Sequence, residues 1–334
     1  MSFKQFDNED VIVSADSISS TVWSTDTYQL TTFETSSTQE AATSGDYYLN
    51  VFQTGSSVST ATTQFSIAYG HPDGVGSSPY NTNVAGKSPS STIYGQYRNL
   101  VLGDEEQQLL FGGIASTKGF YAITVDRARY KEKLLPGTFS LTLADGSQTV
   151  VLTDNSAQTS TVSYNDAGRV YQVISGSAGS AYDGGTGFSA TNGYVASFGL
   201  FLPDIGVILL NAQALDNHLP NLNFTTGSSD ANGANNGLLK TRLSNFSLNS
   251  EETISSNYVF VRVRNGEFNY SNNPSNITGS GELRHNSMVN NPQSYITSVG
   301  LYNDNNDLLG VAKLSKPLLK DFTKEALVRI KLDY

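Results

Sequence analysis

The chain has 334 residues, enough for one large domain or for two to three smaller ones that each bury a core. It contains no cysteine, which excludes disulfides and thiolate metal sites, and its formal charge of −10 makes it a poor general binder of duplex DNA, whose affinity rests on neutralised phosphates. No apolar run reaches the roughly 18 residues of a membrane span, and the first residues lack the basic and then apolar plan of a secretory signal. We therefore expect cytoplasmic synthesis without membrane insertion.

The first seventy residues predict several short strands. Turn-forming Ser, Thr, Asp and Gly residues interrupt them about every ten residues, a spacing that favours a sandwich or a barrel. The runs rich in β-branched and aromatic residues are 11–13, 20–24, 28–33, 47–52 and 64–69. The stretch 71–90, which contains three prolines, predicts a long loop of the kind that often contacts a partner.

The segment 91–103 is the best helix candidate. Ile93, Tyr97, Leu100 and Val101 recur at helical spacing, and Gly103 is suited to end the helix, although a short strand also fits. Further strands are predicted at 108–111, 119–125 and 169–174. The alternating runs 138–143 and 148–152 flank an Asp-Gly pair, which is a strong hairpin signal.

Two runs in the middle of the chain, 194–202 and 205–210, are apolar at successive positions and predict central strands covered on both faces. Residues 225–237 carry no large apolar side chain, which predicts the least structured segment and a linker. A short helix is expected at 238–248, from the spacing of Leu239, Leu243 and Phe246.

The last segment predicts strands and a hairpin. Over 259–264, three valines fall on one face of an extended chain and two arginines on the other, and 295–302 and 307–315 flank an Asn/Asp cluster as in a hairpin. In the final run the alternation places Val328, Ile330, Leu332 and Tyr334 on one buried face. The sequence therefore predicts a mainly β fold of antiparallel sandwich- or barrel-like domains with one or two short helices, divided at 1–90, 91–224 and 238–334.

One basic segment stands out in this acidic chain. Arg127, Arg129, Lys131 and Lys133 alternate along 125–135 and would form one basic face on a strand. Such a face fits contact with an acidic neighbouring subunit or with DNA. The simpler interpretation is a solvated face that pairs locally with Asp126 and Glu132.

No motif in the chain predicts catalysis or a bound cofactor. His71, His218 and His285 lack metal-site spacing, and the Asn/Asp run 303–307 is better explained by turn chemistry than by calcium binding. The acidic run 104–106 does not form a positioned carboxylate pair and predicts a solvated turn after the helix. We expect no enzyme activity, no metal and no cofactor.

Seven segments of the chain are distinctive as strings of residues, at 6–10, 94–103, 264–274, 288–293, 300–306, 314–317 and 321–334. These strings resemble structural proteins of large contractile-tailed phages, especially those of cyanobacteria. The resemblance covers most of the chain and is strongest over its final quarter. This resemblance implies a virion component without catalytic residues.

On this basis we expect a structural virion subunit, tail- or baseplate-associated, whose partners are other virion proteins and copies of itself. The alternatives are a neck or capsid protein, and a receptor- or glycan-binding module of a tail fibre. The glycan-binding alternative expects exposed aromatic residues in a concave patch, for which Tyr80, Tyr94, Tyr97 and Tyr182 are candidates.

Overall fold

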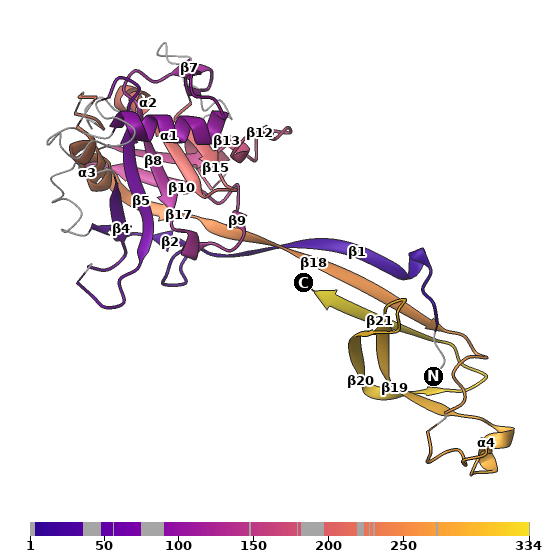
Figure 1. Cartoon of the computed structure of the whole chain (residues 1–334). Coiled ribbons are helices and arrows are strands. Elements are labelled where there is room, and N and C mark those ends of the chain that lie inside the picture. Colours follow the sequence, from indigo (N-terminus) through magenta and orange to yellow (C-terminus); the bar gives the residue numbers. More distant parts are fainter. Residues whose placement is uncertain are drawn as a thin grey trace. The chain divides into compact units, whose positions relative to one another are not determined.

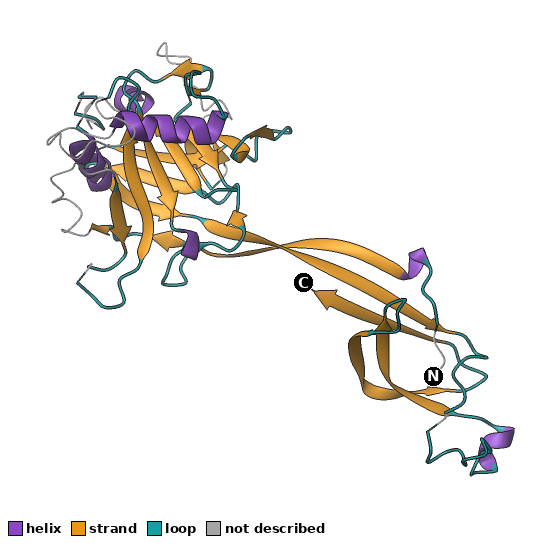
Figure 2. Cartoon of the chain, in the orientation of Figure 1, coloured by secondary structure: helices purple, strands orange, loops and turns teal. Residues whose placement is uncertain are grey.

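The computed structural model describes residues 4–35, 48–55, 57–74, 90–146, 148–178, 180–181, 197–218, 224–226, 228–229, 231–271 and 273–333. The fold is mainly antiparallel β, as the sequence predicts (Figures 1 and 2). None of the helices in these ranges is long and apolar enough to cross a membrane.

The chain forms two compact units. Unit 1 comprises Met1–Ser17 and Thr253–Tyr334, and unit 2 comprises Ile18–Glu252. Both boundaries fall inside strands, since β1 spans Val11–Thr21 and β18 spans Asn249–Val263. Unit 1 therefore contains both ends of the sequence, and unit 2 its middle.

A large curled sheet dominates unit 2, and its described part has 13 strands. In spatial order the main path is β2 (Gln29–Leu30), β17 (Leu243–Ser247), β10 (Ser140–Ala144), β11 (Thr149–Asp154), β13 (Gly168–Ser177), β15 (Gly199–Leu202), β16 (Val207–Asn211), β8 (Phe120–Val125), β5 (Thr63–Gly70), β4 (Leu49–Phe52) and β3 (Glu34–Thr35). Two short strands, β12 (Ser163–Asn165) and β14 (Ser180–Ala181), pair with β13.

Both faces of this sheet carry a core. Alternate residues on one face form the larger core, in which Phe246 lies 4.9 Å from Trp23 and 5.4 Å from Phe65 between ring centres. Helix α1 (Ser90–Leu102) lies across the other face (Figure 1). There the Tyr94 ring packs on Phe120. Strands β15 and β16 are buried along their whole length, which confirms the predicted pair of central strands.

Helix α1 also confirms the predicted helix, and Gly103 ends it in the left-handed conformation with φ +62°. The hairpin of β10 and β11 and its Asp-Gly turn are confirmed in the same way. Unit 2 contains further short elements, which are α2 (Ala212–His218), α3 (Asn232–Arg242), the 3-10 helix η2 (Arg127–Arg129), β6 (Leu110–Phe111), β7 (Ile114–Ala115) and β9 (Lys133–Leu134).

The linker predicted at 225–237 is wrong over its second half, because α3 begins at Asn232. The side-chain amide of Asn232 donates to the Tyr69 carbonyl oxygen at 2.6 Å, and the Thr226 backbone N–H donates to Asn235 at 2.8 Å. Buried hydrogen bonds therefore hold an Asn- and Gly-rich helix of low intrinsic propensity. The short helix predicted at 238–248 is likewise only partly correct, since α3 ends at Arg242 and β17 follows.

Unit 1 is built from long strands. β18 lies between β1 and β21 (Ala326–Asp333), and β19 (Ser294–Tyr302) forms a hairpin with β20 (Leu308–Lys320). The described part also holds η1 (Asn8–Asp10) and α4 (Ser287–Asn290). Val259, Val328 and Ile330 pack against Leu301 of β19 in a small core. The predicted hairpin and the two predicted C-terminal strands are thus confirmed, and the structure adds that β18 and β21 pair with each other. Leu332, however, is 39% exposed, and Tyr334 lies outside the described residues.

The two units differ from the three predicted domains. β5, from the predicted first domain, pairs with β8 from the second, and β17 from the third pairs with β10. All four strands belong to one sheet. Local sequence patterns do not indicate which distant strands pair. For this reason the domain boundaries predicted from them fall inside a single core.

Candidate functional site

The predicted basic residues do not share a strand. Arg127 and Arg129 lie in η2, Lys131 follows in a loop, and Lys133 begins β9. The Arg127 guanidinium lies 4.7 Å from the centre of the Tyr130 ring and donates to the Tyr130 carbonyl oxygen at 2.7 Å. The single basic face expected of a strand is therefore not formed.

Lys133 belongs to an ionic network within unit 2. Its ammonium lies 3.7 Å from the Glu132 carboxylate and 3.9 Å from that of Glu251, which also lies 3.8 Å from Arg169. Arg169 in turn contacts Asp204 at 2.7 Å. The predicted local pairing with Glu132 is present, and contact of the basic segment with an acidic partner remains a prediction.

The network favours the charged form of the Asp204 carboxylate. Burial raises the pKa of this carboxyl, but hydrogen bonds from the Arg169 side chain and backbone N–H, together with the guanidinium charge, outweigh burial and lower it. These charged groups are therefore paired with one another within unit 2, and their pairing contributes to its stability.

The other sequence candidates lie in turns or in packed surroundings. Backbone N–H groups of Glu106 and Gln107 donate to Asp104 and lower the pKa of its carboxyl, as in a solvated turn. The buried His71 ring accepts from the Asp73 backbone N–H at 3.0 Å. Among the described residues, no group of three or more His, Cys, Asp or Glu residues could hold a metal ion.

The aromatic patch expected for a glycan-binding module is not formed by its described members. Tyr94 and Tyr97 pack beneath α1 on Phe120, and the Tyr97 hydroxyl bonds to Thr124 at 2.8 Å. Burial raises the Tyr97 pKa more than this hydrogen bond lowers it. Tyr80 and Tyr182 lie outside the described residues.

A polar pocket that the sequence analysis missed lies on the large sheet. Direct pairing across β2, β17 and β10 aligns Gln29, Ser247 and Ser140 in one row. The next row aligns Asn245 with Thr142, which also pairs with Val151 of β11. Because paired strand residues point to the same face, these side chains form one surface. Leu141, Leu143 and Phe246 alternate with them and enter the core on the other side.

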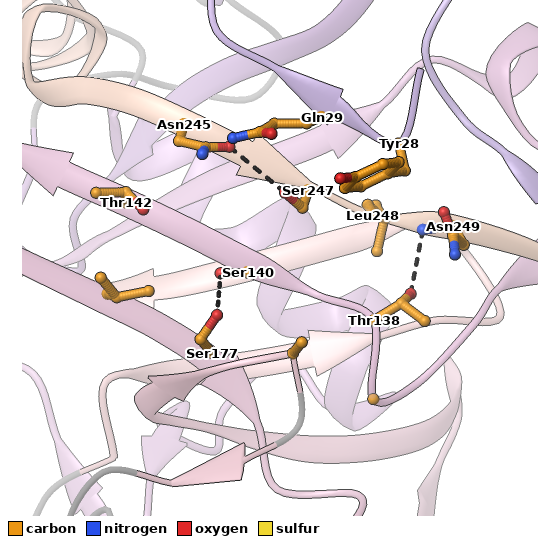
Figure 3. Close-up of a pocket in the computed structure, with 13 residues that line it drawn as sticks. Tyr28, Gln29, Thr138, Ser140, Thr142, Ser177, Asn245, Ser247, Leu248 and Asn249 are labelled. Carbon is orange, nitrogen blue, oxygen red and sulfur yellow. Dashed lines mark hydrogen bonds between the residues drawn. The ribbon is translucent and has the colours of Figure 1, made fainter. Parts of the chain in front are cut away.

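The polar pocket has a volume of about 480 Å³ (Figure 3). It is lined by Tyr28, Gln29, Gly137, Thr138, Ser140, Thr142, Val151, Ser177, Ala178, Asn245, Ser247, Leu248 and Asn249, none of them charged. The Tyr28 ring, 63% exposed, lies at its rim beside Leu248 (Figure 3). This lining offers neutral donors and acceptors and no carboxylate or imidazole for proton transfer.

Exposed apolar side chains are concentrated in unit 1. Counted over the described residues, 14 of the 22 exposed large hydrophobic side chains lie in unit 1, which is less than a third of the chain. They are Phe6, Val11, Ile12, Val13, Tyr270, Val289, Tyr295, Leu308, Leu309, Val311, Leu318, Phe322, Leu327 and Leu332. Single exposed apolar residues are normal, whereas a high share of them in a small unit favours contact with a partner.

Charge differs between the two ends of unit 1's sequence. Asp7, Glu9, Asp10 and Asp16 lie on or just before β1. On β20, β21 and the turn between them, six basic residues (Lys313, Lys316, Lys320, Lys324, Arg329 and Lys331) outnumber Asp321, Glu325 and Asp333, and Lys324 and Lys331 pair with Asp321 and Asp333. In the described structure, β1 and β21 each pair on one side only, with β18, so both have a free edge.

The chain matches no known protein family, no curated protein and no solved structure. Its function is therefore argued from the two units themselves.

Proposed function

We propose that the chain is a structural virion subunit of a contractile-tailed phage, associated with the tail or baseplate, which assembles with copies of itself through unit 1. The concentration of exposed apolar side chains in unit 1 carries this proposal. Fully burying a Leu, Val or Phe side chain stabilises an assembly by about 1.5–3 kcal/mol. A few of the 14 exposed side chains are sufficient to favour association.

The free edges of β1 and β21 suggest how copies associate. A free edge offers unpaired backbone groups to another strand. The acidic β1 side of one copy complements the basic β20–β21 side of the next, so contact between unlike edges is favoured over contact between like edges. Unlike edges make a head-to-tail interface, which forms a ring when the rotation between copies closes.

A mixing experiment tests this interface. One variant carries Arg329→Glu, and the other carries Glu9→Lys. Each variant alone brings a reversed charge against a like charge at the contact, whereas contacts between the two variants restore opposite charges. Asp10, Asp16, Lys324 and Lys331 stay unchanged because each already interacts within one copy.

Size-exclusion chromatography with light scattering measures the outcome. We expect the natural sequence to associate, each variant alone to associate less, and the equimolar mixture to recover. A natural chain that stays monomeric at high concentration, or a mixture that does not recover, contradicts assembly through these edges. Mass spectrometry of purified phage particles tests the virion assignment separately, because a chain absent from the particle is not a virion subunit.

A further inference from the structure

We propose that the polar pocket of unit 2 binds a neutral saccharide. Four of its polar side chains, those of Tyr28, Gln29, Thr142 and Asn249, have no hydrogen-bond partner among the described residues, and the amide nitrogen of Asn245 also has none there. These groups are half-buried or exposed at the pocket, so they are free to bond a ligand.

The chemistry of the free groups selects the ligand class. A side-chain amide donates and accepts at once, as does a hydroxyl, and this matches neighbouring sugar hydroxyls, which also do both. An anionic ligand would need a cation to offset its desolvation, and the lining holds none. The exposed Tyr28 ring adds an apolar face on which the C–H face of a sugar ring can pack.

The position of the pocket argues against a peptide. Peptides that join a sheet pair with the backbone of an edge strand. The pocket instead lies over the side chains of β17, β10 and β11, whose backbones already pair with one another. Its volume of about 480 Å³ lies in the range of small-ligand sites, roughly 300–1,000 Å³.

Two deletions of hydrogen-bonding groups test the pocket directly. Thr142→Val keeps the shape and removes the hydroxyl, and Asn245→Leu removes the amide. Tyr28→Ala removes the rim ring. Thr149→Val, at an exposed position of β11, and Tyr164→Ala, a 72% exposed tyrosine of β12, are the matched controls.

The probes are neutral monosaccharides and disaccharides (glucose, galactose, mannose, N-acetylglucosamine and their dimers), with glucuronic acid and an uncharged Ser/Asn peptide for comparison. Backbone amide NMR shifts and calorimetry follow binding to the full chain. We expect at least one neutral sugar to shift the amides of β10 and β17. Each pocket variant should weaken that binding about three- to tenfold, the effect of one lost hydrogen bond or ring contact.

The two controls should bind within about twofold of the natural sequence, well below the effect of one lost hydrogen bond, and all five variants should keep its melting temperature. The proposal is overturned if no neutral sugar shifts these amides, if binding survives the three pocket substitutions, or if only glucuronic acid or the peptide binds. Because the pocket lies in unit 2, its variants leave the association test of unit 1 unaffected, and the two proposals can fail independently.

Discussion

The two units differ in how much of their apolar surface they bury for themselves. Unit 2 fills both faces of its sheet with large side chains, among them the fully buried Trp23, Phe139 and Phe246. The core of unit 1 has four buried residues, Val259, Leu301, Val328 and Ile330, and leaves most of β1 and β20 exposed. A two-stranded hairpin such as β19–β20 is only marginally stable alone. We therefore expect unit 2 to be stable by itself and unit 1 to gain stability from the partner proposed above.

Removing the last strand should have the largest effect and should be confined to unit 1. Deleting Leu327 to Tyr334 removes Val328 and Ile330 from the small core, each worth about 1.5–3 kcal/mol. It also leaves one edge of β18 unpaired. We expect hydrogen exchange to show unit 1 unprotected and unit 2 unchanged.

The control for this deletion is removal of Met1 to Lys4 at the other end of the sequence. Lys4 makes only a partly exposed ion pair with Glu267 and a hydrogen bond to the Arg262 carbonyl oxygen. That truncation should leave the protection of both units nearly unchanged. If the C-terminal deletion behaves in the same way, β21 is peripheral and the contrast between the units is mistaken.

Substituting two leucines, one buried within the chain and one exposed, tests whether the two units bury their apolar residues in different ways. Leu141 is fully buried in unit 2, and Leu309 is 70% exposed in unit 1. Leu141→Ala should destabilise unit 2 by about 2–5 kcal/mol, while Leu309→Ala should leave monomer unfolding unchanged and weaken association. Urea unfolding and light scattering on both variants measure this, and equal effects on stability would argue against the comparison.

Replacing a glycine in the left-handed backbone conformation should cause a smaller loss of stability in unit 2. Gly103 ends α1 with φ +62°, a conformation that costs a residue with a Cβ about 1 kcal/mol. A Cβ there would also approach the Asp166 carboxylate, which must move. We expect Gly103→Ala to lower the free energy of unfolding of unit 2, measured by urea unfolding, by about that amount. Gly113→Ala, which has open space around it, is the control for strain alone.

The smallest expected effect on stability is the loss of the Asp204 charge at low pH. Its pKa is lower in the folded chain than in the unfolded one, so its contribution to stability is present above the unfolded pKa. That contribution is lost as the pH falls through the lower folded value, below about pH 4. The melting temperature of the natural sequence should exceed that of Asp204→Asn at pH 6, and the gap should close on acidification. A gap independent of pH would mean that the carboxylate charge is not what stabilises the network.

Much of the local structure could be predicted from the sequence. The helix at α1 and the hairpins of β10–β11 and β19–β20 follow from side-chain period and turn residues, which act over a few neighbouring positions. The same is true of the buried strands β15 and β16. Where the prediction from local pattern was wrong, contacts with distant residues determine the structure. In α3, for example, side-chain amides bond to residues far away in the sequence or in a neighbouring loop.

The candidate sites could not be predicted in the same way. Alternation along 140–143 places Ser140 and Thr142 on one face, and that is all the sequence by itself determines there. Only the pairing of β2, β17, β10 and β11 aligns these side chains with Gln29, Asn245 and Ser247, because strand partners are chosen by the whole core. In unit 1 the sequence likewise determined which strand residues are apolar. The tertiary structure decided that its small core covers only a few of them, since covering the rest requires a surface that unit 1 does not supply.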